Sequence, residues 1–366
     1  MWDDAMPRQG RHTKRKWKLT ILGIVLAALT AGAAWVAVHP ELPGAVKSAL
    51  LARLDDGPKD QWVPGEETPE TAFFLKGLVY TLKEQRLVAW DPEGEAQGQW
   101  ELSLEAPQVV RSEAGAVFYE PGGRTLYRLD GELTELSVPG GIAAAAVSDR
   151  GACAVITQGS GAMTLTRRFD RAGNRLEDIQ LADQAMVLMT YLRNSDTLAA
   201  CCVTEDGDWV LRFADGNHTI EQTLEDRMVY DLRPWSGGVV LWTDRGLMAY
   251  DDGGTCVQQA RLNTGELLLM DSGSFCGAVV RRGAECLLLT ITNKAVTETA
   301  LEREPRALSV CGSGLALLDS QALLLYDSNG ALLRREPQGA LASSVQALDG
   351  GALLFGETGF FRAQTE

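Results

Sequence analysis

A short motif recurs along most of this chain: an apolar strand, an Asp or Asn residue, a Gly-rich tight turn and an alternating strand. The turn residues are Asp91, Asp130, Asp170, Asp215, Asp251, Asn293 and Asp327, with a mean spacing of about 39 residues. Turns of the Asp-Gly type supply the positive φ angles that tight β-hairpins require. The sequence therefore predicts a repeat array of short strands that are joined by hairpins.

A second marker follows the same period. A polar pair and a glycine precede an apolar strand at Gly115, Gly151, Gly238, Gly273, Gly314 and Gly351. Each unit then contains four short strand-like segments, as residues 267–301 and 306–337 illustrate. Four strands in every ~40 residues are typical of a β-propeller. We therefore predict an all-β fold, a β-propeller of four-stranded blades over residues 71–366.

The number of blades follows from the unit starts, of which the sequence has eight. The last unit, residues 345–363, contains only three strand-like segments. A closed ring needs a fourth strand in its last blade, and we expect a segment before residue 71 to supply it, with residues 60–63 as the candidate. We predict about eight blades; seven is the alternative if the first unit is shared across the closure.

Side-chain size and polarity predict which strand of each unit is innermost. Blades converge on the axis of a ring, so we expect small residues on the inner strands, and the candidates are residues 143–146, 199–202, 277–278 and Ala316. Outer strands are half exposed and should alternate apolar with polar residues. The segments with that pattern are residues 98–104, 132–138, 175–181 and 219–224. This pattern also places several acidic residues on the rim.

The N-terminal region differs in charge from the rest of the chain. Residues 1–18 hold six Lys or Arg against two Asp, a net of +4, so the remainder carries −19 of a formal total of −15. Residues 19–38 contain no charged residue, and as a helix they would span about 30 Å, the hydrocarbon thickness of a bilayer. Trp17 and Trp35 lie near the two ends, where indole favours the interface. We predict a cytoplasmic basic tail at 1–18, a transmembrane helix at 19–38 and an extracytoplasmic domain after it.

Two other interpretations of residues 19–38 stay open: a cleavable signal peptide, with residues 31–33 as a small-residue cleavage site, and a buried core helix. The apolar run continues through Trp35 to Val38, which favours an uncleaved anchor. Lipidation would need a Cys just after the apolar run, whereas the first Cys is Cys153.

Residues 39–70 contain five prolines and are expected to form a Pro-rich stalk that also holds the ring-closing strand.

Residues 87–94, with Trp100 after them, resemble one repeat of the quinoprotein-like propellers, in which an Ala-x-Asp, a Gly and a Trp lock neighbouring blades. The Trp-Asp pair at 90–91 resembles the signature of WD-repeat propellers, although the chain has no Gly-His. The whole layout resembles a family of Gram-positive bacterial proteins with a basic tail, one membrane helix and an external propeller-like domain. That resemblance implies an architecture and a location, but no activity.

The chain has seven cysteines, which are Cys153, Cys201, Cys202, Cys256, Cys276, Cys286 and Cys311. Most fall within predicted strands, and we interpret them as small buried apolar residues, with a disulfide between neighbouring blades as the alternative. Neighbours in a strand point to opposite faces, so Cys201 and Cys202 cannot share one metal ion. No Cys-x-x-Cys occurs, which argues against zinc.

The other polar motifs have simple structural interpretations. His218 is the only His of the predicted propeller and falls in a hairpin turn, so a Ser-His-Asp triad would have to be built on this loop alone. Residues 205–208 and 251–252 are acidic, but they lack the full calcium-loop pattern and are interpreted as turns. The phosphate-binding pattern G-x-x-x-x-G-K-[ST] does not occur, and the lone Gly-x-Gly turns at 159–161 and 312–314 lack a following helix. We assign no catalytic, cofactor-binding or metal-binding residues.

Two functions from different classes fit these observations. The first is a non-catalytic protein-binding scaffold in the cell envelope, anchored in the membrane through residues 19–38. Its charge of −19 favours a basic envelope protein as the partner and argues against nucleic acid. The alternative is an extracytoplasmic propeller enzyme of the lyase, glycosidase or quinoprotein type, with acidic residues at the axis. Acids at the axis would favour the enzyme, and acids on the rim favour the scaffold, which we prefer.

Overall fold

The structure is a computed structural model that describes residues 63–64, 69–91, 94–158, 164–180, 184–215, 218–225, 227–262, 265–312, 314–337, 342–348, 351–356 and 359–364. The predicted basic tail, transmembrane helix and most of the stalk lie outside these residues. Within the described ranges, no helix is long and apolar enough to cross a membrane. The described residues belong to one compact unit, residues 60–366, and the elements named in it are all β-strands.

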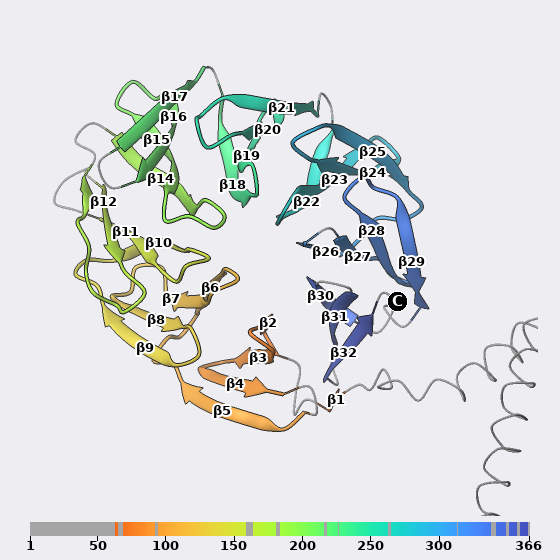
Figure 1. Cartoon of the computed structure of the whole chain (residues 1–366), viewed down its shortest axis with the longest axis horizontal. Coiled ribbons are helices and arrows are strands. Elements are labelled where there is room, and N and C mark those ends of the chain that lie inside the picture. The colour runs from red at the N-terminus through yellow and green to blue at the C-terminus, as the bar shows by residue number, and fades with distance from the viewer. Residues whose placement is uncertain are drawn as a thin grey trace, which may run out of the picture. The chain divides into compact units, whose positions relative to one another are not determined.

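The described strands form eight four-stranded antiparallel sheets that are arranged in a ring (Figure 1). We number these sheets as blades in chain order. Blade 1 contains β2 (Thr71–Leu75), β3 (Leu78–Lys83), β4 (Arg86–Trp90) and β5 (Ala96–Glu101). Blade 2 contains β6 (Gln108–Arg111), β7 (Ala116–Tyr119), β8 (Thr125–Leu129) and β9 (Leu133–Ser137). Blade 3 contains β10 (Ile142–Val147), β11 (Cys153–Gln158), β12 (Thr164–Phe169) and β13 (Ile179–Gln180).

The next four blades follow the same order along the chain. Blade 4 contains β14 (Gln184–Tyr191), β15 (Leu198–Thr204), β16 (Trp209–Asp215) and β17 (His218–Leu224), and blade 5 contains β18 (Val229–Trp235), β19 (Gly238–Thr243), β20 (Gly246–Tyr250) and β21 (Cys256–Arg261). Blade 6 contains β22 (Glu266–Ser272), β23 (Cys276–Arg282), β24 (Glu285–Ile291) and β25 (Val296–Leu301), and blade 7 contains β26 (Ala307–Cys311), β27 (Gly314–Leu318), β28 (Leu323–Asp327) and β29 (Leu332–Glu336). Blades 1 to 7 each consist of four consecutive strands, which confirms the predicted four-stranded repeat.

Blade 8 joins the two ends of the ring. Its strands are β30 (Ala342–Leu348), β31 (Gly351–Gly356), β32 (Gly359–Gln364) and β1 (Val63–Pro64), and β1 pairs with β32 through Val63 opposite Phe360. A strand from before residue 71 therefore completes the last blade, as the sequence predicts. Of the candidate segment 60–63, only Val63 lies among the described residues.

The recurring Asp turn connects the third and fourth strands of a blade. In blades 1, 3, 5 and 7, the Oδ1 atom of this Asp accepts the backbone N–H four residues on, at 2.7–2.8 Å; the four residues are Asp91, Asp170, Asp251 and Asp327. The Gly three residues after each Asp has a φ between +78° and +84°, a conformation that favours glycine. The hairpin turns predicted at these four positions are confirmed.

The first strand of each blade lies innermost in the ring and the fourth lies outermost (Figure 1). The four segments with alternating polarity overlap β5, β9, β13 and β17, so the prediction of outer strands is confirmed. The prediction of small residues on inner strands is correct only for β10. Residues 199–202, 277–278 and Ala316 lie instead on the second strands β15, β23 and β27, where they are fully buried. Neighbouring blades cover both faces of a second strand, and this close packing explains the small side chains.

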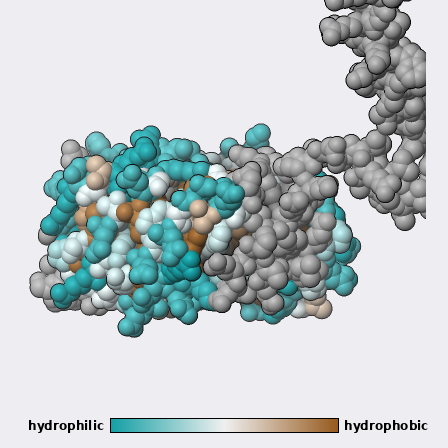
Figure 2. All heavy atoms as spheres, turned by 90° about the horizontal axis from the view of Figure 1, so that it is seen from below, coloured by the Kyte–Doolittle hydropathy of each residue, from teal (hydrophilic) through white to brown (hydrophobic). Residues whose placement is uncertain are grey.

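The core lies between adjacent blades. One cluster combines Phe73 and Tyr80 of blade 1 with Phe118 and Tyr127 of blade 2. The ring centroid of Phe73 lies 5.4 Å from that of Tyr80 and 6.2 Å from that of Phe118. Each blade thus covers an apolar face of the next one. The rim visible in Figure 2 is largely hydrophilic, with scattered apolar residues between the polar ones.

Candidate functional site

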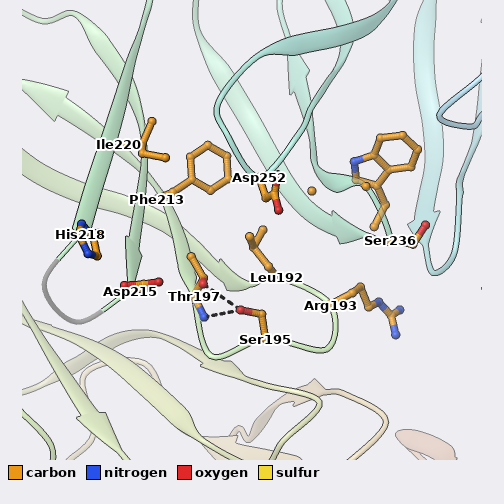
Figure 3. A pocket seen from close by; sticks show the side chains of 13 residues that line it. Leu192, Arg193, Ser195, Thr197, Phe213, Asp215, His218, Ile220, Ser236 and Asp252 are labelled. Atoms are coloured by element: carbon orange, nitrogen blue, oxygen red, sulfur yellow. Dashed lines mark hydrogen bonds between the residues drawn. The ribbon is translucent and has the colours of Figure 1, made fainter.

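A pocket of about 430 Å³ lies between blades 4 and 5. Residues of the β14–β15 hairpin, of β16 and β17, and of the β18–β19 and β20–β21 turns line it. In Figure 3, His218 and Asp215 lie at one end of the pocket, and Arg193 and Ser236 lie at the other. Exposed residues at both ends open the pocket to solvent.

The apolar part of the lining is rigidly packed. Phe213 and Trp235 are only 2% and 1% exposed. The indole Nε1 of Trp235 donates a hydrogen bond to the carbonyl of Tyr250 at 3.4 Å, which fixes the ring against its own blade. Ile220 is 42% exposed and offers an apolar contact at the opening of the pocket.

Two exposed carboxylates stand beside this apolar lining. Asp215 ends β16 and pairs with His218 across the β16–β17 hairpin. Asp252 belongs to the β20–β21 turn, in which the neighbouring Asp251 accepts the Thr255 N–H at 2.7 Å. Asp251 therefore holds the turn, while Asp252 faces the pocket (Figure 3). Carboxylates next to apolar side chains suit a cation that is carried on an aliphatic stem.

Ser195, His218 and Asp215 all line the pocket, but they do not form a triad. The Ser195 hydroxyl donates to Oγ1 of Thr197 at 2.8 Å and accepts the Thr197 N–H at 3.0 Å (Figure 3). Ser195 thus stabilises its own hairpin. Among the residues that the structure describes, none forms a hydrogen bond with the imidazole of His218. A nucleophile needs a base within hydrogen-bond reach, and this pocket does not provide that geometry.

Arg193 connects the inner end of the pocket to other blades. Its Nη1 lies 2.9 Å from the Glu113 carboxylate of blade 2 and 3.8 Å from the Asp149 carboxylate of blade 3. Its Nη2 donates to the carbonyl of Ser272 in blade 6 at 3.0 Å. One side chain therefore ties hairpins of four blades together on the pocket side of the ring.

Acidic side chains occupy both the rim and the inner strands. Several lie on fourth strands, namely Glu101, Glu135, Glu221 and Glu298. Asp231 and Asp271 lie on the inner strands β18 and β22. The acidic segment 205–208 forms the β15–β16 hairpin, with Gly207 at a φ of +89°, as predicted. In the described part of the chain, no group of three or more His, Cys, Asp or Glu is placed to hold a metal ion.

All seven cysteines have free thiols. Cys153, Cys201, Cys202 and Cys276 are buried as predicted, whereas Cys311 is only half-buried because it ends the inner strand β26. Burial raises the pKa of the Cys153 thiol to about 12 and that of Cys202 to about 11. Cys201 packs toward blade 5 and Cys202 toward blade 3, so the pair does point to opposite faces of β15.

The pocket is a site that reasoning from the sequence did not find. Its residues come from five segments of two blades, and each segment alone looks like an ordinary strand or turn. The sequence predicts His218 in a hairpin turn, whereas the structure places it as the first, exposed residue of β17. One sequence signal could have indicated the pocket: Asp215 and Asp252 are acidic residues at turns of consecutive repeats. The ring brings these two turns to the same side of neighbouring blades.

No protein-family model and no curated protein sequence matches this chain. Solved structures of propeller proteins do match its fold. Dihydro-heme d1 dehydrogenase NirN aligns with a TM-score of 0.52 and 13% identity over 88% of this chain and 85% of that one. The WD40 domain of SCAP from fission yeast aligns at 0.51 and 10% over 84% and 98%. BamB from Moraxella catarrhalis aligns at 0.51 and 11% over 82% and 97%. These likenesses establish the β-propeller fold and nothing about activity.

Proposed function

We propose that this chain is a membrane-anchored extracytoplasmic scaffold that binds another protein of the cell envelope without turnover. The pocket between blades 4 and 5 receives a basic side chain of that partner. The observation that carries the proposal is the pair of exposed carboxylates, Asp215 and Asp252, on either side of an apolar lining. Propeller faces present several hairpins on a rigid frame, which suits a binding surface.

A Lys or Arg side chain matches this lining in shape and charge. Its aliphatic stem would contact Ile220 and Phe213, while its cation would reach the carboxylates. The turn that carries Asp252 packs directly against blade 4, because a Cβ atom at Gly254 would lie 3.3 Å from Cγ2 of Ile220. The contact between blades 4 and 5 therefore holds the carboxylate of Asp252 next to the apolar side chain of Ile220 in the pocket.

The location of the scaffold is part of the proposal and rests on the N-terminal sequence. The six cations of residues 1–18 favour the cytoplasm, and the uncharged run 19–38 is long enough for one crossing. The propeller would then lie outside, held off the membrane by the Pro-rich segment 39–70. A charge of −19 after residue 18 would speed the encounter with a basic partner, and salt would weaken this attraction.

Site-specific crosslinking in native membranes tests the proposal. A photoreactive residue in place of Ile220 in the full-length chain should yield one defined protein adduct. The double change Asp215→Asn with Asp252→Asn should lower the yield about fivefold, since two exposed charges each contribute roughly 0.2–1 kcal/mol. Rising salt should lower the yield further.

Matched controls lie at the opposite end of blade 4. A photoreactive residue in place of Asp206 in the β15–β16 turn should not give this adduct, and Asp206→Asn with Asp208→Asn should leave the Ile220 adduct unchanged. An adduct that resists the loss of Asp215 and Asp252, or no adduct from Ile220, would show that this pocket is not the docking site.

A further inference from the structure

Charged side chains on inner strands of opposite blades interact electrostatically, away from the pocket between blades 4 and 5. Arg111 ends β6 of blade 2, Arg233 lies on β18 of blade 5, and Asp271 lies on β22 of blade 6. Arg111 interacts electrostatically with both Asp271 and Arg233. Blades 2 and 6 face each other across the ring (Figure 1).

The guanidinium of Arg111 has few protein partners. Its Nη1 donates to Oε1 of Gln346 on β30 at 3.2 Å, and its Cζ lies 5.6 Å from the ring centroid of Phe73 on β2. No described carboxylate lies within ion-pair distance of it. Most of its five N–H donors are therefore open to a ligand, and Phe73 supports the planar group through its ring face.

The surroundings of Arg111 make it a strong binding group. Desolvation by the surrounding protein lowers the pKa of Arg111; the negative charge of Asp271 opposes this shift, and the positive charge of Arg233 adds to it. The residue is nevertheless solvent-exposed, so a small solute can reach it. A cation that is desolvated by protein but unpaired gains free energy when an anion binds to it.

The two neighbouring aspartates are already engaged. Asp231 accepts from Nε of Arg233 at 2.9 Å and from the Leu232 N–H at 2.8 Å. Asp271 accepts the Val310 N–H at 2.9 Å. These bonds hold both carboxylates in place, and neither carboxylate comes within ion-pair distance of Arg111, although Asp271 still acts on it electrostatically. Arg233 keeps 47% of its side-chain surface exposed and can contribute a second set of donors.

We propose that Arg111 and Arg233 form an axial site for the carboxylate group of a small monoanion. The planar fork of a guanidinium matches a carboxylate bidentately. Asp271 acts on both arginines and Asp231 on Arg233, so a doubly charged phosphate would meet more repulsion there than a single carboxylate. This inference is independent of the scaffold function, because it uses neither the blade 4–5 pocket nor the membrane anchor.

A ligand-detected NMR titration tests the site. The full-length chain in mild detergent is titrated with benzoate, with its neutral counterpart benzamide and with inorganic phosphate. Benzoate should bind at least about tenfold more tightly than the other two, since charge-assisted hydrogen bonds to Arg111 depend on the carboxylate. Arg111→Gln should weaken benzoate binding about tenfold or more, and Arg111→Lys should restore only part of it.

Control variants separate binding from folding. Arg335→Gln on the outer strand β29 removes an arginine that pairs with Glu302 at 3.1 Å, and it should leave benzoate binding unchanged. If Arg111→Gln lowers the melting temperature, Arg111→Lys and Arg233→Gln replace it as the binding test. The proposal is overturned if benzoate shows no saturable binding below about 10 mM, if it binds equally to the arginine variants, or if phosphate binds as tightly.

Discussion

The innermost and outermost strands of this ring differ in how far along the chain their polar partners lie. On the inner strands, Gln346 exchanges hydrogen bonds with Phe74, 272 residues away, and accepts one from Arg111, 235 residues away. Near the rim, Arg282 pairs with Glu298 at a separation of 16 residues, through two contacts of 3.0 Å. The inner network exists only when the whole ring is closed, whereas the rim pairs form within one blade or, as in Arg335 with Glu302, between consecutive blades.

This difference separates the part of the molecule that stabilises each blade from the part that depends on the assembled ring. Outer strands keep alternating polarity and ion pairs with partners close in the sequence, within a blade or from the next blade. Inner and second strands are packed on both sides by neighbouring blades. Changes near the axis should therefore have larger effects than the same changes at the rim.

The largest effect is expected from a tryptophan on an inner strand. Trp235→Ala should reduce the free energy of unfolding by about 3–5 kcal/mol, because a fully buried aromatic leaves a cavity that neighbouring blades cannot fill. Trp100→Ala on the outer strand β5, where the side chain is half-buried, should cost roughly half as much or less. Urea unfolding of both variants measures the difference. Equal losses would show that the inner and outer strands do not differ in packing.

Thiol reactivity should follow the same division. Cys256 on the outer strand β21 is exposed and should react with a maleimide quickly. Cys202 and Cys153 on second strands should react at least about 100-fold more slowly at pH 8, because burial blocks access and raises their pKa to about 11 and about 12. Mass spectrometry of the labelled protein over time distinguishes the sites. Fast labelling of Cys202 would mean that blades 3 and 4 separate readily.

Ring closure gives a smaller effect, because the closing strand β1 is an outer strand of only two described residues. Deletion of residues 60–66 should lower the melting temperature by several degrees, equivalent to about 2 kcal/mol, since it exposes the edge of β32. Removal of seven residues farther upstream, 52–58, is the matched control and should have no such effect. Identical melting curves for the two deletions would show that β1 does not stabilise the ring.

The smallest effect is expected at the rim. Glu298→Gln removes one partner of the pair with Arg282, whose side chains are 47% and 30% exposed. Because water screens such pairs, the loss in unfolding free energy should stay below about 1 kcal/mol and shrink further in high salt. Differential scanning calorimetry at two salt concentrations checks both points. A loss as large as that of Trp235→Ala would contradict the proposed division.

The same division explains what the sequence could predict. The turn at Asp251 and the outer position of the polar strand β17 follow from local sequence, because they depend on a few neighbouring residues, and both were predicted correctly. The blade 4–5 pocket and the Arg111 cluster bring together residues that are tens to hundreds of positions apart, and no local pattern marks them. The small residues 199–202 were assigned to the wrong strand. Small side chains indicate tight packing, but they do not indicate which strand of the sheet is tightly packed.

The Asp turns carry a last consequence, which concerns symmetry. Among the described residues, the turn with these hydrogen bonds occurs in blades 1, 3, 5 and 7, at Asp91, Asp170, Asp251 and Asp327, so it recurs about every 80 residues. In this feature, blades 1, 3, 5 and 7 share one turn geometry, which the described turns of blades 2 and 6 do not have. A ring that is enlarged or reduced by whole pairs of blades would keep that alternation, whereas the gain or loss of a single blade would place two like turns side by side.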